Sequence, residues 1–294
     1  MTVHNRARLL ATASAAALGA STVIGKFALD FLPPITLMVV QLLGSLLVLW
    51  PFVILTRRPI PPLRCEILQR ASTGTLEPAL TFLLALYGLK FTTAGEASLI
   101  ATLETVMILG LSVALFRARV ERHLLALALL ATLGAVLVVG TTASSNSFWG
   151  NLLVLAGTAC AALYVVLNQR ELPDLEPLVM VGLQQIAALI LVLLVLAVAF
   201  VLGQPVVPEH LVWWGWLLVA LTGVIQYALA FGLYFTAQRD MPANETALYL
   251  TLTPVFGLLG SAIFLGERLN TIQWLGALVI VGSIAAMAVF SNHE

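Results

Sequence analysis

The sequence predicts an all-α, polytopic membrane protein with ten transmembrane helices. Apolar runs of about twenty residues recur along the 294-residue chain, and short polar joints separate them. Because the bilayer hydrocarbon is about 30 Å thick and a helix rises about 1.5 Å per residue, about 20 apolar residues cross it. Within lipid only a helix or a closed barrel satisfies the backbone, and these runs lack the alternating pattern of barrel strands. The runs therefore predict membrane-spanning helices.

The composition leaves almost no room for a soluble domain. The chain is 61% hydrophobic and only 10% charged, with a formal net charge of zero, and its mean hydropathy is +1.03. No G-x-x-x-x-G-K-[ST] motif occurs, so we expect no nucleotide-hydrolysing domain. We also expect no cofactor and no nucleic-acid partner. Cys65 falls in a polar joint and Cys160 in an apolar run, which argues against a disulfide.

The sequence also argues against an enzyme. All four histidines lie at chain ends or joints, so no histidine cluster is available for a metal or a proton relay. Neither G-x-S-x-G nor H-E-x-x-H occurs. We therefore expect no catalytic residues and no metal site.

The apolar runs are separated by turn-forming residues, such as Pro33-Pro34 and Met241-Pro242. The first run follows Arg6 and Arg8, as in a signal peptide, but it is long and continues into further spans, so we expect it to be retained. The predicted spans are 8–30, 34–55, 69–91, 94–116, 122–141, 148–169, 177–203, 211–236, 244–265 and 271–290.

Basic residues predict the orientation, because Lys and Arg in short loops favour the cytoplasmic side. With a cytoplasmic N-terminus, eleven of the 14 Lys and Arg residues lie on the inner side, and only Lys26, Lys90 and Arg268 lie on the outer side. The inner residues are Arg6, Arg8, Arg57, Arg58, Arg64, Arg70, Arg117, Arg119, Arg122, Arg170 and Arg239. An even number of spans returns the C-terminus to the cytoplasm. We expect a multi-pass protein of the bacterial inner membrane, with the lipid bilayer as its surroundings.

The two halves of the chain resemble each other. Residues 102–106 (TLETV) align with 251–255 (TLTPV), 149 positions later, and the same shift aligns 94–96 with 243–245. Pro34 and Gln41 align with Pro177 and Gln184 at a shift of 143. A chance match between Leu- and Ala-rich sequences is the alternative. The pattern predicts two five-helix repeats, residues 1–146 and 147–294, in one membrane unit.

An odd number of spans in each half inserts the second copy upside down. Inverted repeats are typical of secondary transporters, whose substrate sites lie near the midplane between the repeats. This feature points most directly to function.

The topology and a closing stretch of motifs resemble the drug/metabolite transporter superfamily. The stretch is Glu245, then Pro254, then residues 266–269 (GERL) before the last run. The likeness is closest to EamA-type members and, among them, to bacterial aromatic amino acid exporters. It implies a transporter of small metabolites, often an exporter, with spans 1, 3, 4, 6, 8 and 9 around a central cavity. The first repeat has Ala118 where the second has Glu267, so Glu267 is open to a simpler reading, that it only fixes a helix end.

Several predicted spans carry a stripe of small or polar residues on one face. Such stripes line a pathway or simply allow helices to pack closely, and both interpretations stay open. Tyrosine offers a flat apolar ring and a hydroxyl, which suits an amphipathic ligand of amino-acid size. The predicted substrate-binding residues are Glu77, Thr81, Ser98, Thr102, Tyr164, Asn168, Tyr227, Tyr249 and Thr253.

Ionisable residues inside the spans are stronger candidates for lining the pathway, because a charge at the bilayer centre is costly and usually faces a cavity or a partner. Glu77 shares a face with Thr81, and Pro78 loosens the helix beside it. We expect Glu77 to face the pathway. Two hypotheses stay open for its role: it binds a proton and couples it to substrate movement, or it only hydrogen-bonds helices or the backbone at Pro78 and transport is facilitative. Glu104 lies deep but away from the Ser98 and Thr102 stripe, so a structural role and a pathway role stay equally open. Lys26 near the outer end is explained by snorkelling.

The sequence therefore predicts a secondary transporter that exports small metabolites by alternating access without ATP hydrolysis. Its expected substrates are amino acids, aromatic and other neutral ones. Export of drugs or other metabolites, a passive channel, and a membrane-bound enzyme or receptor are the alternatives.

Overall fold

Helices are the only regular elements in the described part of the chain. The computed structural model describes residues 3–62, 64–116, 122–140, 145–168, 176–207, 213–237, 240, 249–250 and 252–291. Six helical stretches there are long and apolar enough to cross a membrane, and two shorter ones, Thr253–Phe264 and Thr271–Ser283, are also apolar. The six are Asn5–Ala28, Pro34–Leu55, Ala94–Leu115, Ser147–Leu167, Leu178–Val201 and Trp213–Tyr234. The chain is a multi-pass membrane protein whose described part is all-helical.

Five of the predicted spans are single continuous helices in the structure. They are α1 (Val3–Ala28), α2 (Pro34–Leu55), α7 (Arg122–Gly140), α8 (Ser145–Leu167) and α9 (Pro177–Val201), and the last predicted span is a sixth continuous helix, α14 (Thr271–Ser291). Pro34 and Pro177 begin their helices, where the missing N–H costs nothing. Gly203 and Gly266 follow α9 and α13 with φ of 70° and 65°, a conformation that a Cβ disfavours.

The other spans are interrupted near their middle. The third consists of α3 (Cys65–Ser72), a 3-10 turn η1 (Thr73–Thr75), a π-helical turn η2 (Leu76–Leu80) and α4 (Thr81–Leu89). Glu77 lies in this break with a non-helical φ of −134° and ψ of 121°, and Pro78 has no N–H for a regular helical bond. The remaining segments are α5 (Ala94–Ala101), α6 (Glu104–Phe116), α10 (Trp213–Gly223), η3 (Val224–Leu229), α11 (Ala230–Ala237) and α13 (Thr253–Phe264).

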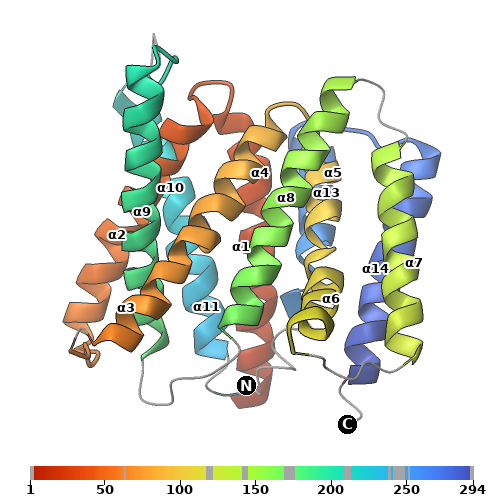
Figure 1. Ribbon diagram of the computed structural model, residues 1–294, viewed down its shortest axis with the longest axis horizontal. Helices are drawn as coiled ribbons and strands as arrows, with labels where there is room; N and C mark the ends of the chain where they lie inside the picture. Colours follow the sequence, from red (N-terminus) through yellow and green to blue (C-terminus); the bar gives the residue numbers. More distant parts are fainter. Residues whose placement is uncertain are drawn as a thin grey trace.

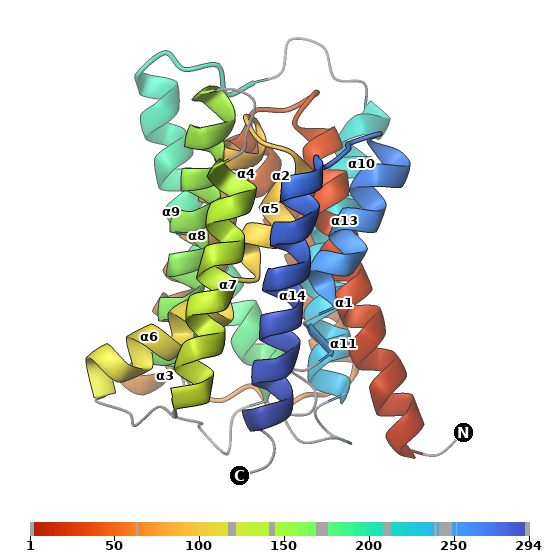
Figure 2. The same ribbon diagram turned by 90° about the vertical axis from the view of Figure 1, so that its right-hand side faces the viewer.

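The helices stand side by side in one bundle. α1 begins and α14 ends at the same end of this bundle, which we call the terminal end (Figure 1). Figure 1 shows α7 and α14 at one side of the bundle and α2, α9 and α10 at the other. Figure 2 shows α7 and α14 packed along each other. The largest buried cluster joins α2 and α9 to the broken third and eighth spans, and includes Leu42, Ala79, Val192 and Tyr227.

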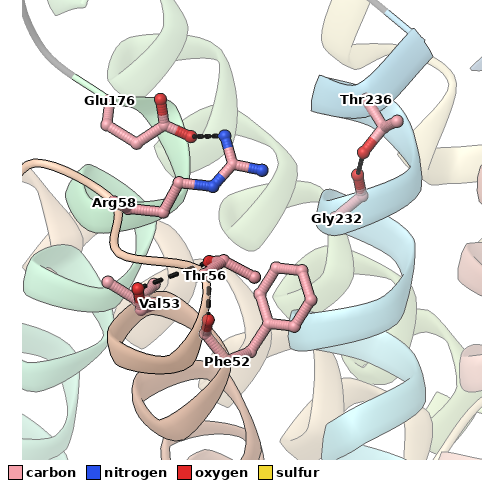
Figure 3. A network of polar contacts seen from close by, with 7 residues as sticks. All are labelled: Phe52, Val53, Thr56, Arg58, Glu176, Gly232 and Thr236. Atoms are coloured by element: carbon pink, nitrogen blue, oxygen red, sulfur yellow. Dashed lines mark hydrogen bonds and ion pairs between the residues drawn. The ribbon is translucent and has the colours of Figure 1, made fainter.

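An ion pair links the segments that follow α2 and precede α9. Arg58 Nη1, just after α2, lies 2.8 Å from Oε1 of Glu176, just before α9 (Figure 3).

Two packing contacts recur at positions that the repeat alignment relates. Gln184 Nε2 donates to Thr73 Oγ1 at 3.1 Å, and Gln41 Nε2 donates to Thr222 Oγ1 at 2.8 Å. The threonines are 149 residues apart and the glutamines 143 residues apart, as in the alignment.

The glycine after each threonine makes an equivalent contact. A Cβ on Gly74 would meet the Gln184 backbone, and a Cβ on Gly223 would meet the Gln41 backbone. Helix pairs recur in the same way, since α4 packs on α8 while α11 packs on α1. We therefore propose that residues 1–146 and 147–294 are the two related repeats.

Candidate substrate cavity

A cavity of about 360 Å³ lies among the segments predicted as spans 1, 3, 4, 6, 8 and 9. Its volume falls at the lower end of the 300 to 1,000 Å³ range (roughly) that small-molecule sites occupy. Most of its surface is apolar, with aromatic rings from Phe82, Tyr164, Phe231 and Tyr234. The arrangement suits a small ligand with both apolar and polar parts.

Breaks in the helices bring polar side chains to this cavity. Glu77 lies in η2 and Gln226 in η3, where the chain departs from regular α-helix. Glu104 is the first residue of α6 and Thr253 is the first residue of α13. In each pair the two residues are 149 positions apart, so equivalent places in the two halves supply all four groups.

These four side chains make no hydrogen bond to any other residue that the structure describes. The Thr253 hydroxyl is buried without a partner, and Gln226 is only 7% exposed. Several other polar lining groups are satisfied by the protein itself: Ser14 donates to Ala230 O at 2.8 Å and Thr81 to Leu76 O at 3.0 Å. Since buried polar groups are normally paired, the four unpaired groups indicate where a ligand or water binds.

The side chains that can carry a full charge in the described cavity lining are both acidic. Glu77 and Glu104 lie close enough to interact electrostatically, and the described lining contains no Lys, Arg or His. Buried charges are strongly disfavoured without partners. The pair is therefore suited to hold cations or protons.

The structure brings only some of the predicted substrate-binding residues to the cavity. Glu77, Thr81, Tyr164 and Thr253 line it. Tyr164 is held in place, since its hydroxyl donates to Gln184 Oε1 at 3.0 Å. Contact of these residues with a substrate remains a prediction.

Ser98 and Thr102 lie outside the cavity lining, although the small-residue stripe predicted them there. The Ser98 side chain lies against Gly257 of α13, and the Thr102 hydroxyl donates to Leu99 O at 2.6 Å. α5 and α6 instead present Ala97, Ala101 and Glu104 to the cavity. Here the stripe packs one helix against another, which is the second of the two interpretations that the sequence allows.

The other predicted residues also lie elsewhere. Tyr227 is 1% exposed and packs edge-on against Phe82, with ring centroids 5.2 Å apart. Asn168 Nδ2 donates to Thr73 Oγ1 at 3.1 Å. Tyr249 packs against the cluster around Ala7 and Ala237. Their side chains pack against other residues or form internal hydrogen bonds, and none of them lines the cavity.

Two cavity residues are better supported by the structure than by the sequence. The sequence pattern does not decide between a structural and a pathway role for Glu104, and it does not predict Gln226. The 149-residue shift that aligns the halves relates Gln226 to Glu77, which is the signal that could have found it.

Polar contacts fix the helix ends away from the terminal end. Lys26 Nζ donates to the carbonyls of Leu89 and Thr92, each at 2.6 Å, so it caps the end of α4 rather than snorkelling freely. Glu267 Oε1 and Oε2 accept from the N–H groups of Ala94 and Gly95 at 3.0 and 3.1 Å. A carboxylate at a helix N-terminus is favourable, so Glu267 stabilises the start of α5.

A buried network lies beside this capped end. Glu96 Oε1 accepts from Gln273 Nε2 at 2.6 Å, and Glu96 Oε2 accepts from Asn151 Nδ2 at 2.9 Å and Thr92 Oγ1 at 2.8 Å. The network joins the starts of α5, α8 and α14. Glu96 therefore has partners on three segments, unlike the two carboxyls in the cavity.

A multi-pass helical bundle with a central cavity and interrupted helices is the architecture of a membrane transporter. The chain belongs to the EamA-like transporter family, whose model matches residues 5–140 and 148–289.

Comparison with individual proteins agrees with this family. The uncharacterized transporter YetK of Bacillus subtilis (strain 168) is 23% identical over 284 residues, which are 92% of this chain and 83% of that protein. The threonine/homoserine exporter RhtA of Escherichia coli (strain K12) is 30% identical over 187 residues, 62% of this chain and 58% of that protein. A solved crystal structure matches with a TM-score of 0.67 at 20% identity, over 97% of this chain and 98% of that chain. This last likeness concerns the fold alone.

Proposed function

We propose that this transporter exports small neutral amino acids, aromatic ones included, by alternating access between two inverted five-helix repeats. The observation that carries the proposal is the cavity of about 360 Å³, whose apolar and aromatic surface is interrupted by four unpaired polar groups. An amino acid offers both an apolar side chain and charged groups for such a site. The threonine/homoserine exporter among the relatives supports the same substrate class.

A counterflow assay tests the proposal directly. Purified protein in liposomes preloaded with unlabelled amino acid is expected to take up labelled L-phenylalanine, L-leucine or L-threonine transiently above equilibrium. Ethidium and a sugar serve as control solutes. Uptake of ethidium alone would favour drug export, and flux without any counterflow would favour a channel.

We further propose that the protein lies in the bacterial inner membrane with its terminal end in the cytoplasm, because basic residues gather in the loops of that side. Cys65 is an exposed free thiol beside Arg64 on that side. We expect an impermeant maleimide to label Cys65 only after the cells are permeabilised.

The matched variant carries Ser145→Cys together with Cys65→Ser and Cys160→Ser. We expect its new thiol to react in intact cells, because Ser145 begins α8 at the end of the bundle opposite the terminal end, which the proposal assigns to the outer side. Labelling of both positions from the same side would contradict the ten-span topology.

A further inference from the structure

Equivalent positions of the two halves bring different chemistry to the cavity. Where the first half has Glu77 and Glu104, the second half has Gln226 and Thr253. Both carboxyl groups therefore belong to the first half, and at the equivalent positions the second half carries neutral groups that can donate hydrogen bonds. We call Glu77 and Glu104 the acidic side of the cavity, and Gln226 and Thr253 its donor-bearing side.

We infer that this asymmetry orients the substrate. A neutral α-amino acid binds with its ammonium group toward Glu77 and Glu104, and with its carboxylate toward Gln226, Thr253 and the start of α13. The inference rests on the proposed function, since it concerns the pose of an amino acid in the same cavity.

The acidic side suits an ammonium group and excludes a carboxylate. Neither Glu77 nor Glu104 has a hydrogen-bond partner among the described residues, and no basic side chain of that part lines the cavity. An ammonium donates to carboxylate oxygens in short, charge-assisted hydrogen bonds. A substrate carboxylate placed there would instead be repelled by the negative charge of the ionised pair.

The donor-bearing side suits a carboxylate. Gln226 is 7% exposed and carries an amide N–H₂ with no hydrogen bond within the described residues, and the Thr253 hydroxyl is buried without a partner. Thr253 also begins α13, a helix of 12 residues. The dipole of this helix favours an anion at its N-terminal end.

The other half-helix cannot serve the same purpose. α6 begins at Glu104, whose own carboxylate already supplies negative charge at that N-terminus. The start of α13 has no such internal anion, because Thr253 and Pro254 stand there. The two half-helix starts are therefore not equivalent for an anionic group.

Competition in the counterflow assay tests the pose with three probes. They are L-phenylalanine, its amide, which keeps the ammonium but lacks the carboxylate, and its N-acetyl derivative, which lacks the ammonium. If phenylalanine is not carried, L-threonine and its two derivatives replace it. In the wild type we expect each derivative to compete about tenfold more weakly than the parent, since each loses one charge-assisted contact.

Variants then separate the two sides. Thr253→Val and Gln226→Met are expected to abolish the preference for the parent over the amide and to keep its preference over the N-acetyl derivative. Glu104→Gln is expected to abolish the preference for the parent over the N-acetyl derivative and to keep its preference over the amide. Ser283→Ala removes a buried, unpaired hydroxyl outside the cavity lining and is expected to keep both preferences.

Each outcome decides the inference. The pose would be overturned if Glu104→Gln lost the preference over the amide while Gln226→Met and Thr253→Val lost the preference over the N-acetyl derivative. Equal loss of both preferences in Gln226→Met and Thr253→Val would also overturn it, even if amino acids are transported. Absence of amino-acid counterflow in the wild type would instead refute the proposed function. Size-exclusion profiles identify misfolded variants, and Gln226→Met carries the test if Thr253→Val does not fold.

Discussion

Gly223→Ala and Gly74→Ala are each expected to destabilise the protein severely. At both positions a new Cβ would meet the backbone of a glutamine on a neighbouring helix, Gln41 or Gln184. A backbone cannot rotate away as a side chain does, so α2 or α9 would have to move as a whole. We expect a loss of at least about 3 kcal/mol, at the upper end of what overpacking costs.

The measurement is the apparent melting temperature of the detergent-solubilised protein. Gly110→Ala and Gly282→Ala are the matched controls, because nothing lies within 4 Å of a Cβ at either position. Both lie in helices, where alanine is favoured over glycine by about 1 kcal/mol, so these variants should be as stable as the wild type or more so. Equal melting of Gly223→Ala and the controls would show that the helices separate easily at this contact.

Glu77→Gln is expected to abolish accumulation driven by a pH gradient while leaving downhill exchange intact. The amide keeps the shape of the side chain and resembles the protonated acid, but it cannot take up or release a proton. Glu104 lies close to Glu77 in the same cavity. It remains available to the substrate, which is why exchange should survive.

Sealed vesicles with an imposed pH gradient provide the measurement, with labelled L-phenylalanine or L-threonine as the probe. Glu96→Gln is an informative comparison, because that carboxyl is held by Gln273, Asn151 and Thr92 outside the cavity. We expect it to affect stability and to leave the response to pH in place. If the wild type ignores the gradient, transport is facilitative and the coupling hypothesis is wrong.

The sequence by itself determined the class of the protein and much of its local geometry. The cost of burying a polar backbone in lipid turns each long apolar run into a helix, whatever its neighbours are. Pro78 and Pro254 likewise mark where the third and ninth spans are interrupted, because proline removes a helical hydrogen bond. The family followed from the order of these spans and the closing motif, and the comparisons agree with it.

Only the tertiary structure decided which helix faces form the cavity. A stripe of small residues has the same period whether it lines a pathway or packs on another helix, so the pattern around Ser98 and Thr102 could not distinguish the two. Glu104 was placed by the break between α5 and α6, which turns the start of α6 toward the cavity. The helix-end role of Glu267 depends on the N–H groups of α5, more than 170 residues away in the chain. Such contacts arise from the packing of the two halves, and no local pattern in either half contains them.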